Sequence, residues 1–358
     1  MRWLFAPPPK KPDPLAKIMA DRAALLKRER ELSRRIERLY RGAKKAIEPQ
    51  LQELTAKIKE AEALGLTVGP SWLAGEARMT ALLAQIELQL GAAAKTATKA
   101  TEQAQRVGIG RGSKDAIGAM REAAKYAGVA SAFDVLPTEA LEHLAGTMAN
   151  GTPLAAWFDA IGPTARESAA QTLFNGLAQG ISPYQIARDL RGVLDISKTS
   201  AMITARQASI GAYRAANLAE YQANSDVLSG WRWVCSYSIR TCAMCIAMDG
   251  TEHAADEQMV SHLECRCSAS PILADGAEQT RTTGSEWFAG QDAETQNTIL
   301  GPLKGELYRS GDISLADLVK QGTDVTWGDW RAEKSVRDLV SEGSLSNRQV
   351  NEAASAAR

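Results

Sequence analysis

The sequence lacks net charge and long apolar runs, and it has few histidines. Its 358 residues include 42 Lys or Arg against 42 Asp or Glu, so net charge does not draw the molecule to nucleic acid or to an acidic membrane. No stretch approaches the roughly 18 to 20 consecutive apolar residues of a membrane span, so we expect a soluble protein with no membrane partner. The apolar run within residues 1–11 is too short for the core of a signal peptide. Electrostatic partners must therefore bind local patches of charge.

Apolar residues at helical spacing fill the N-terminal part of the chain. From Leu15 to Ala46 they recur mostly at steps of three, four and seven residues, which predicts one long helix. The pattern continues past Pro49 and stops at Gly65 and Gly69. A later alanine-rich helix is expected to end near the glycines at 108, 110 and 112. Shorter helices are predicted around residues 114–126, 137–148, 164–177, 183–190 and 200–221.

The periodicity changes from helical to alternating at Gly230. Trp231, Trp233 and Cys235 then face one way, which predicts a strand, and residues 268–273 form a second strand-compatible run. The predicted fold class is mainly α, with long N-terminal helices, a helical body and a small α+β cysteine-rich module near residues 228–275. We expect four domains: a basic N-terminal helical arm (1–70), a helical region (71–163), the domain that holds the cysteine module (164–275) and a C-terminal helical tail (276–358).

Basic residues concentrate in the N-terminal arm. Residues 1–45 hold fourteen Lys or Arg against five Asp or Glu. One interpretation is a solvated helix face. The other is a contact surface for DNA or for an acidic protein, because phosphates attract clustered cationic side chains. The candidate contact residues are Lys27, Arg28, Arg34, Arg35, Arg38 and Arg41.

All five cysteines lie within 33 residues of one another. They are Cys235, the pair Cys242-Ala-Met-Cys245 and the pair Cys265-Arg-Cys267, and His262 precedes Cys265 by three residues. A C-x2-C pair on a tight turn directs two sulfurs at one point, and a second group about twenty residues later can complete a tetrahedron around zinc. The candidate metal ligands are Cys242, Cys245, Cys265 and either His262 or Cys267.

Three interpretations of this cluster stay open. The first is a structural zinc ion. The second is a set of free or partly disulfide-bonded cysteines, since a cytoplasmic protein keeps its thiols reduced unless a metal holds them. The third is a catalytic metal, for which Asp249, His253 and Asp256 could supply acid or base groups from the same loop. Of the three histidines, only His262 lies among potential ligands.

Together, these residues resemble a known family. Trp231, the segment Arg240-Thr-Cys242-Ala-Met-Cys245, Asp249-Gly250 and the segment His262-Leu-Glu-Cys265-Arg-Cys267 are similar to the Mu F-like phage head morphogenesis domain. The resemblance covers about residues 165–273. Downstream, Glu286-Trp-Phe288 and Tyr308-Arg-Ser-Gly311 are similar to the tail that is often appended to this domain.

The resemblance implies a minor head (minor capsid) protein. The C-terminal tail offers no arrangement of nucleophile, base and oxyanion-binding groups, so we expect no enzymatic activity. A minor head protein binds the portal protein at the head vertex during procapsid assembly in the host cytoplasm, and it becomes part of the virion. It is sometimes linked to DNA packaging or ejection, so packaged DNA is a further expected partner. The major capsid protein or the scaffolding protein is another. Two alternatives from other classes stay open: a zinc-dependent nuclease or hydrolase that uses His253 or His262, and a sequence-independent DNA-binding module that uses the basic arm.

Overall fold

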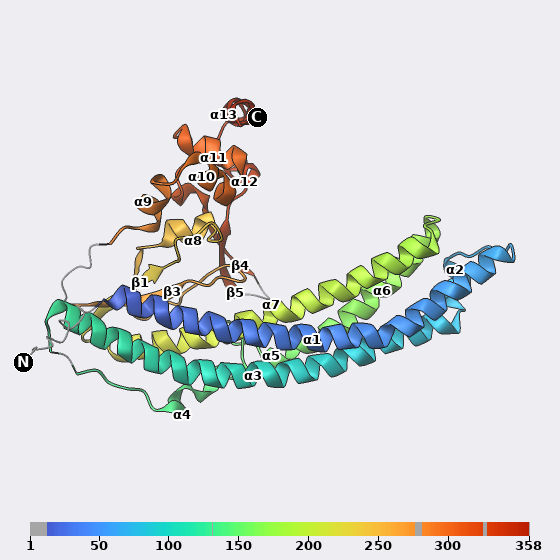
Figure 1. Ribbon diagram of the computed structural model, residues 1–358, viewed down its shortest axis with the longest axis horizontal. Coiled ribbons are helices and arrows are strands. Elements are labelled where there is room, and N and C mark those ends of the chain that lie inside the picture. Colours follow the sequence, from blue (N-terminus) through green and yellow to red (C-terminus); the bar gives the residue numbers. More distant parts are fainter. Residues whose placement is uncertain (1–12, 131, 276–280, 325–327, 358) are drawn as a thin grey trace, which may run out of the picture. The chain divides into compact units, whose positions relative to one another are not determined.

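The computed structural model describes residues 13–130, 132–275, 281–324 and 328–357 (Figure 1). This part of the chain is mainly helical, as predicted, and contains a three-stranded sheet and a two-stranded hairpin. No helix among these residues is long and apolar enough to cross a membrane. The N-terminal run within residues 1–11, judged too short for a signal peptide, lies outside the described residues.

The chain forms two compact units, each assembled from non-contiguous segments. Among the described residues, the bundle unit contains those in 27–108 and 143–212, and the sheet unit contains those before Lys27, those in 109–142 and those from Tyr213 onward. Three long helices contribute residues to both units: α1 (Pro14–Ala63), α3 (Ala77–Ala127) and α7 (Pro183–Ala223). The four contiguous domains expected from the sequence stay a prediction.

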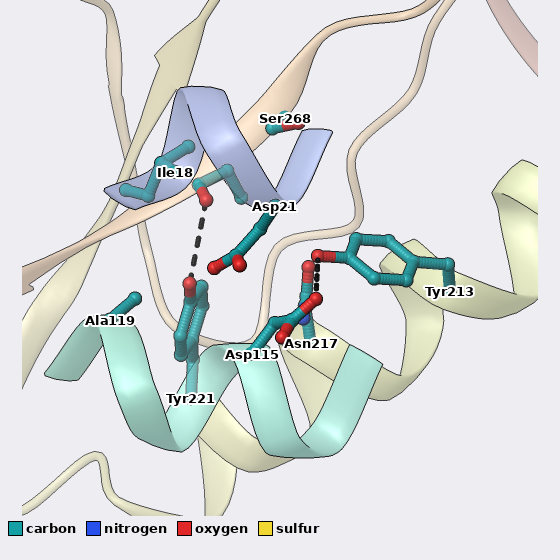
Figure 2. Close-up of a pocket in the computed structure, with 9 residues that line it drawn as sticks. Ile18, Asp21, Asp115, Ala119, Tyr213, Asn217, Tyr221 and Ser268 are labelled. Atoms are coloured by element: carbon teal, nitrogen blue, oxygen red, sulfur yellow. Dashed lines mark hydrogen bonds between the residues drawn. The ribbon is translucent and has the colours of Figure 1, made fainter. Parts of the chain in front are cut away.

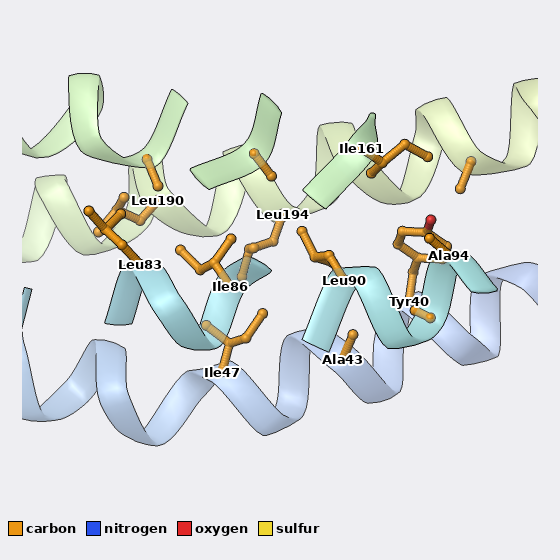
Figure 3. Packing of buried hydrophobic residues seen from close by; sticks show 14 of the residues in the cluster. Tyr40, Ala43, Ile47, Leu83, Ile86, Leu90, Ala94, Ile161, Leu190 and Leu194 are labelled. Atoms are coloured by element: carbon orange, nitrogen blue, oxygen red, sulfur yellow. The ribbon is translucent and has the colours of Figure 1, made fainter. Parts of the chain in front are cut away.

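The bundle unit is built from helices with one apolar face each. The long helices α1, α3 and α7 lie side by side with α6 (Ile161–Ala178), and α2 (Pro70–Ala74) and α5 (Leu154–Asp159) complete the unit (Figure 1). Their shared core is mainly aliphatic, and Figure 3 shows Ile47, Leu90 and Leu194 pointing into it. The predicted long N-terminal helix is confirmed, and it continues through Pro49.

The glycines of α3 do not end that helix. The break expected near residues 108–112 is wrong, because α3 runs on to Ala127. A Cβ atom at Gly112 would lie only 2.5 Å from the carbonyl oxygen of Tyr213, and the side-chain amide of Asn217 donates to the carbonyl of Gly112 at 2.5 Å. Gly112 therefore allows α3 and α7 to pack closely within the sheet unit.

Two other helix predictions also need correction. The helices expected at 183–190 and 200–221 are one continuous helix, α7. The helix expected at 137–148 is only α4 (Thr138–Leu141) followed by a 3-10 turn at Glu142–Leu144. The helical pattern of this last segment was too short to decide between a helix and isolated turns.

The three-stranded sheet forms the centre of the sheet unit. Strand β1 (Leu228–Val234) lies between β2 (Glu252–His253) and β3 (Ser268–Leu273), and both pairings are antiparallel. The predicted alternation is confirmed on one face, where Trp231 and Trp233 are fully buried. They pack against Tyr221 of α7 and against Met244 of the short helix α8 (Ala243–Met248).

The C-terminal tail is helical as predicted, but it also contains a hairpin that the sequence did not predict. Its elements are α9 (Gly284–Ala289), α10 (Ala293–Leu300), α11 (Pro302–Arg309), β4 (Val319–Asp324), β5 (Gly328–Glu333), α12 (Val336–Ser341) and α13 (Asn347–Ala356). Phe288, Leu307 and Leu339 form a core that includes Ile246 of α8. The tail therefore packs directly against the cysteine module.

A polar cluster lies where α1, α3, α7 and β3 meet within the sheet unit (Figure 2). The hydroxyl of Tyr213 donates to the carboxylate of Asp115 at 3.1 Å, and Arg111 lies 2.8 Å from the same group. Lys17 lies 2.6 Å from Asp21, the second carboxylate of the cluster. Burial raises the pKa of Asp115, and the charge of Asp21 raises it further.

Candidate metal centre

The cysteines and His262 come from two segments that flank β2. Cys242 precedes the first turn of α8, and Cys245 lies within that turn, so their three-residue spacing places them on one side of the helix. His262, Cys265 and Cys267 lie in the connection from β2 to β3. Cys245, Cys265 and Cys267 are buried, and all five cysteines of the chain are free thiols.

The ligand atoms form two overlapping groups. The first contains Cys242, Cys245 and His262, and the second contains Cys245, Cys265 and Cys267; within each group all ligand atoms lie within 4.8 Å of one another. The Nε2 atom of His262 is 3.3 Å from the sulfur of Cys242 and 3.2 Å from that of Cys245. The sulfurs of Cys245 and Cys265 are 3.8 Å apart. The structure thus brings together all five predicted ligands.

These separations fit a tetrahedral metal ion. Zn–S bonds of about 2.3 Å and Zn–N bonds of about 2.0 Å place the ligand atoms of one zinc ion about 3.5 to 3.8 Å apart. The 3.8 Å separation of the Cys245 and Cys265 sulfurs matches this value, and the two sulfur–nitrogen separations are a few tenths of an ångström shorter. A cluster of thiols and one imidazole with this geometry can hold a metal ion.

His262 presents the correct nitrogen to the cluster. Its Nδ1 atom is 2.5 Å from the carbonyl oxygen of Leu263, and a carbonyl can only accept, so Nδ1 carries the proton. In the neutral imidazole, the lone pair then belongs to Nε2, which faces Cys242 and Cys245. This second hydrogen bond orients the ring as in many histidine metal ligands.

The thiols and the imidazole also change each other's protonation. A hydrogen bond from Cys245, with a further contribution from His262, lowers the pKa of Cys242 to about 5 although burial opposes the change. Burial lowers the pKa of His262, but its contacts with Cys242 and Cys265 prevail and raise it to about 10. The free cluster therefore favours a thiolate, which is the form of cysteine that binds metals.

The comparison with known families concerns this same part of the chain. Residues 168–270 match the family described as phage Mu protein F like protein. Because of this similarity, we call residues 168–270 the Mu F-like region. The match begins within α6 and ends within β3, and it confirms the resemblance inferred for about residues 165–273. It supports a role in phage head morphogenesis. No curated protein and no solved structure matches the chain significantly.

One arginine of the Mu F-like region holds the C-x-C segment. The guanidinium of Arg214, on α7, donates to the carbonyl of Cys265 at 3.0 Å and to that of Cys267 at 2.7 Å. Its Nη2 atom is also 3.4 Å from the sulfur of Cys265, and only 8% of the residue is exposed. A buried guanidinium beside thiols stabilises their deprotonated form.

A second arginine reaches the same segment from α1. Arg22 donates to the carbonyl of Arg266 at 2.5 Å and to the hydroxyl of Ser236 at 3.2 Å. Neither Arg22 nor Arg214 was identified as a site residue from the sequence. Their contacts span 244 and 51 to 53 residues, so no local pattern indicates them.

Cys235 and Asp249 have structural roles in the Mu F-like region. Cys235 belongs to neither ligand group and packs with Trp231 and Trp233 in the core. Its backbone N–H donates to the buried carboxylate of Asp249 at 2.7 Å. Asp249 also accepts from Tyr237 at 2.9 Å and pairs with Arg281 of the tail. Asp249, which directly follows α8, thus connects the end of this helix to the segment after β1 and to the tail.

His253 has contacts through its ring face and through both of its ring nitrogens. Its ring stacks on Trp231 with a centroid separation of 4.2 Å. Nδ1 lies 2.8 Å from a carboxylate oxygen of Glu257, and Nε2 lies 2.9 Å from the hydroxyl of Thr251. His253 belongs to neither ligand group among the described residues. Both ring nitrogens of His253 are therefore occupied by contacts with side chains that lie close to β2 in the sequence.

The predicted basic contact residues lie outside the Mu F-like region, on α1. All six are exposed: Lys27, Arg28, Arg34, Arg35, Arg38 and Arg41. The bundle unit contains all six residues, and the cysteine cluster lies in the sheet unit. The basic surface and the cysteine cluster are thus separate features of the chain.

Proposed function

We propose that this chain is a phage minor head protein that binds the portal protein at the head vertex and acts in procapsid assembly. The observation that carries the proposal is the match of residues 168–270 to the phage Mu protein F like family. Its contacts with the major capsid or scaffolding protein and its presence in the mature virion belong to the same proposal. Assembly takes place in the host cytoplasm, before the head is filled with DNA.

The role we propose is structural and involves no catalysis. Two of the groups that a hydrolase could use are engaged in the fold: both nitrogens of His253 have hydrogen-bond partners, and Asp249 binds a backbone N–H, Tyr237 and Arg281. The Nε2 atom of His262 lies against the sulfurs of Cys242 and Cys245, and its Nδ1 atom lies against the carbonyl oxygen of Leu263. These contacts favour the head protein over the hydrolase interpretation.

Zinc is the metal that we propose for the cluster, with Cys242, Cys245, His262 and Cys265 as its ligands. Three thiolates and one imidazole suit zinc, and a closed set of four protein ligands is typical of structural sites. Cys267 lies beside this set. The ion would staple α8 to the connection between β2 and β3, a connection that contains little regular structure of its own.

Metal analysis of the reduced full-length protein tests the zinc assignment. We expect one zinc ion per chain in the wild type and in Cys235→Ala, because Cys235 lies outside both ligand groups. The variants Cys242→Ser and Cys265→Ser should bind less than a tenth of an equivalent after dialysis. A wild type that contains no zinc when purified with zinc present would end the assignment.

Co-purification with the portal protein of the same phage tests the head protein proposal. The two proteins are co-expressed, the portal protein is captured by a tag, and the retained fraction of this chain is quantified. We expect stoichiometric or near-stoichiometric retention, with none on the portal protein of an unrelated phage. No retention on the matching portal protein, with both proteins folded, would contradict the proposal.

A further inference from the structure

We propose that the exposed basic face of α1, between Lys27 and Lys45, is a binding surface for the phosphate backbone of double-stranded DNA. The face lies within the bundle unit and uses none of the residues of the cysteine cluster. The inference goes beyond the portal-binding role and stands without it, because DNA binding is measured on the protein alone.

Helical geometry gathers the cationic side chains into rows. One row follows α1 at steps of seven, four, three and four residues, which are the steps that keep side chains on one side of a helix: Lys27, Arg34, Arg38, Arg41 and Lys45. Arg28 and Arg35 form a second row at a seven-residue step. With a rise of about 1.5 Å per residue, the helix advances about 27 Å from Lys27 to Lys45. That length is sufficient to contact several successive phosphates of a duplex.

Burial removes one of the three opposing negative charges from this face. Residues 27–45 contain nine Lys or Arg and three Glu. Glu29 is 3% exposed and turns inward, where Arg206 of α7 lies 2.5 Å away. Glu37 is paired with Arg41 at 2.6 Å. Only Glu31 remains exposed without a described ion-pair partner, so the surface is more positive than the sequence count suggests.

The face lacks the apolar anchors of a protein interface. No large apolar side chain of residues 13–63 is exposed; the exposed ones begin at Leu64. Binding energy at protein interfaces comes mainly from buried aromatic and apolar residues together with arginine, whereas DNA backbone binding needs mainly Lys and Arg. The composition of the face therefore favours nucleic acid over an acidic protein surface.

The test is the affinity of the full-length protein for a fluorescent 30-base-pair duplex, measured by anisotropy between 50 and 200 mM NaCl. If six phosphates are contacted, the slope of log K against log salt is about −5, and affinity falls about a thousandfold over this range. Arg34→Gln/Arg38→Gln should weaken binding at least about tenfold at 100 mM NaCl and make the slope less negative by about 2.

A matched control removes two charges elsewhere. Lys95→Gln/Lys99→Gln has the same four-residue spacing at exposed positions of α3 in the bundle unit, and it should bind the duplex within about twofold of the wild type. Thermal melts establish that both double variants are folded. A second duplex of unrelated sequence should bind equally well, because backbone contacts carry no sequence information.

Three outcomes would overturn the proposal. The first is a wild type that does not bind, or that binds with a salt slope near zero. The second is an Arg34→Gln/Arg38→Gln variant that binds like the control variant. The third is tighter binding to polyglutamate than to duplex DNA, which would assign the face to an acidic protein. None of these results bears on portal binding, so the two proposals fail separately.

Discussion

The guanidinium of Arg214 lies 3.4 Å from the sulfur of Cys265 and donates hydrogen bonds to the carbonyls of Cys265 and Cys267. A single buried side chain of α7 thus holds both the backbone of the C-x-C segment and one of its sulfurs. The same helix packs on the sheet through Tyr221. The cysteine cluster is therefore fixed to the longest helix of the Mu F-like region by a charged group.

Arg214→Lys should weaken metal binding without removing any ligand. A lysine keeps the charge but cannot donate in several directions at fixed geometry, so the C-x-C segment loses part of its support. Loss of such an outer contact typically lowers metal affinity by about 10- to 100-fold. Competition with a chelating dye measures this affinity. In the metal-free protein, the reaction of the cysteines with a disulfide reagent should become slower, because the hydrogen bond that stabilises the Cys265 thiolate is weakened.

Arg240→Lys is the control for this experiment. Arg240 is exposed and lies two residues before Cys242, so the change is chemically identical and close in sequence. It should leave zinc affinity and thiol reactivity unchanged. Equal zinc affinities for Arg214→Lys and the wild type would show that the arginine has no influence on the cluster.

Glu29→Gln should destabilise the bundle unit strongly. The carboxylate of Glu29 has 1% of its side-chain surface exposed and pairs with Arg206 at 2.5 Å. Removal of one partner of a buried ion pair lowers the free energy of unfolding by about 3 to 5 kcal/mol, because the other charge stays buried. Urea denaturation followed by circular dichroism provides the measurement.

The comparison variant is Glu48→Gln, which disrupts a more exposed pair of the same unit. Arg191 and Glu48 have 36% and 26% of their side-chain surfaces exposed. Solvent screens such pairs, so the variant should lose only about 1 kcal/mol or less. Similar losses for both variants would contradict the distinction drawn between the two ion pairs.

Gly112→Ala and Gly110→Ala should have opposite effects on stability. A Cβ at position 112 would lie 2.5 Å from the Tyr213 carbonyl oxygen and forces α3 away from α7, whereas nothing lies within 4 Å of a Cβ at position 110. Alanine at 110 should raise the free energy of unfolding by about 0.5 to 1 kcal/mol through helix propensity, and alanine at 112 should lower it by about 1 to 3 kcal/mol. Chemical denaturation measures the free energy of unfolding of both variants. A Gly112→Ala variant that is more stable than the wild type would contradict the close packing of α3 against α7.

The helix α1, the central strand and Gly112 illustrate which features the sequence can predict and which it cannot. The long helix α1 and the strand at Trp231 and Trp233 follow from local periodicity, and both predictions are confirmed. The ligand cluster was predicted because its residues lie in one short stretch. Gly112 was interpreted as a helix end because glycine has low helix propensity, yet its role depends on a helix about a hundred residues away.

The hairpin of the tail was missed for a similar reason. Its strands, β4 and β5, carry charged and glycine residues that do not alternate with apolar ones. A Cβ at Gly322 would lie 2.6 Å from the ring of Trp330, so the absence of a side chain on one strand makes room for the indole of the other. Cross-strand packing of this kind becomes visible only when the pairing is known.

Asp115→Asn should change how stability depends on pH. Burial and Asp21 raise the pKa of Asp115 in the folded protein. Its contribution to stability is therefore complete below the unfolded pKa of about 3.9 and is lost as the pH rises through the folded value. Relative to the variant, the wild type should lose stability as the pH rises above about 4, and melting temperatures of both proteins at successive pH values measure the difference.

Asp195→Asn provides a control of opposite sign. A hydrogen bond from Lys44 lowers the pKa of Asp195 in the folded protein, so its contribution is present above the unfolded pKa and is lost as the pH falls. Relative to this second variant, the wild type should gain stability as the pH rises toward 7. The same pH trend for both variants would contradict the assigned directions.

The composition of purified phage heads tests the central claim most directly. Procapsids are isolated from cells that express the head genes with and without the portal gene, and this chain is quantified by mass spectrometry. We predict a few copies per particle when the portal protein is present and a loss of at least tenfold when it is absent. A chain that is missing from normal procapsids, or that is incorporated equally without the portal protein, would contradict a portal-bound minor head protein.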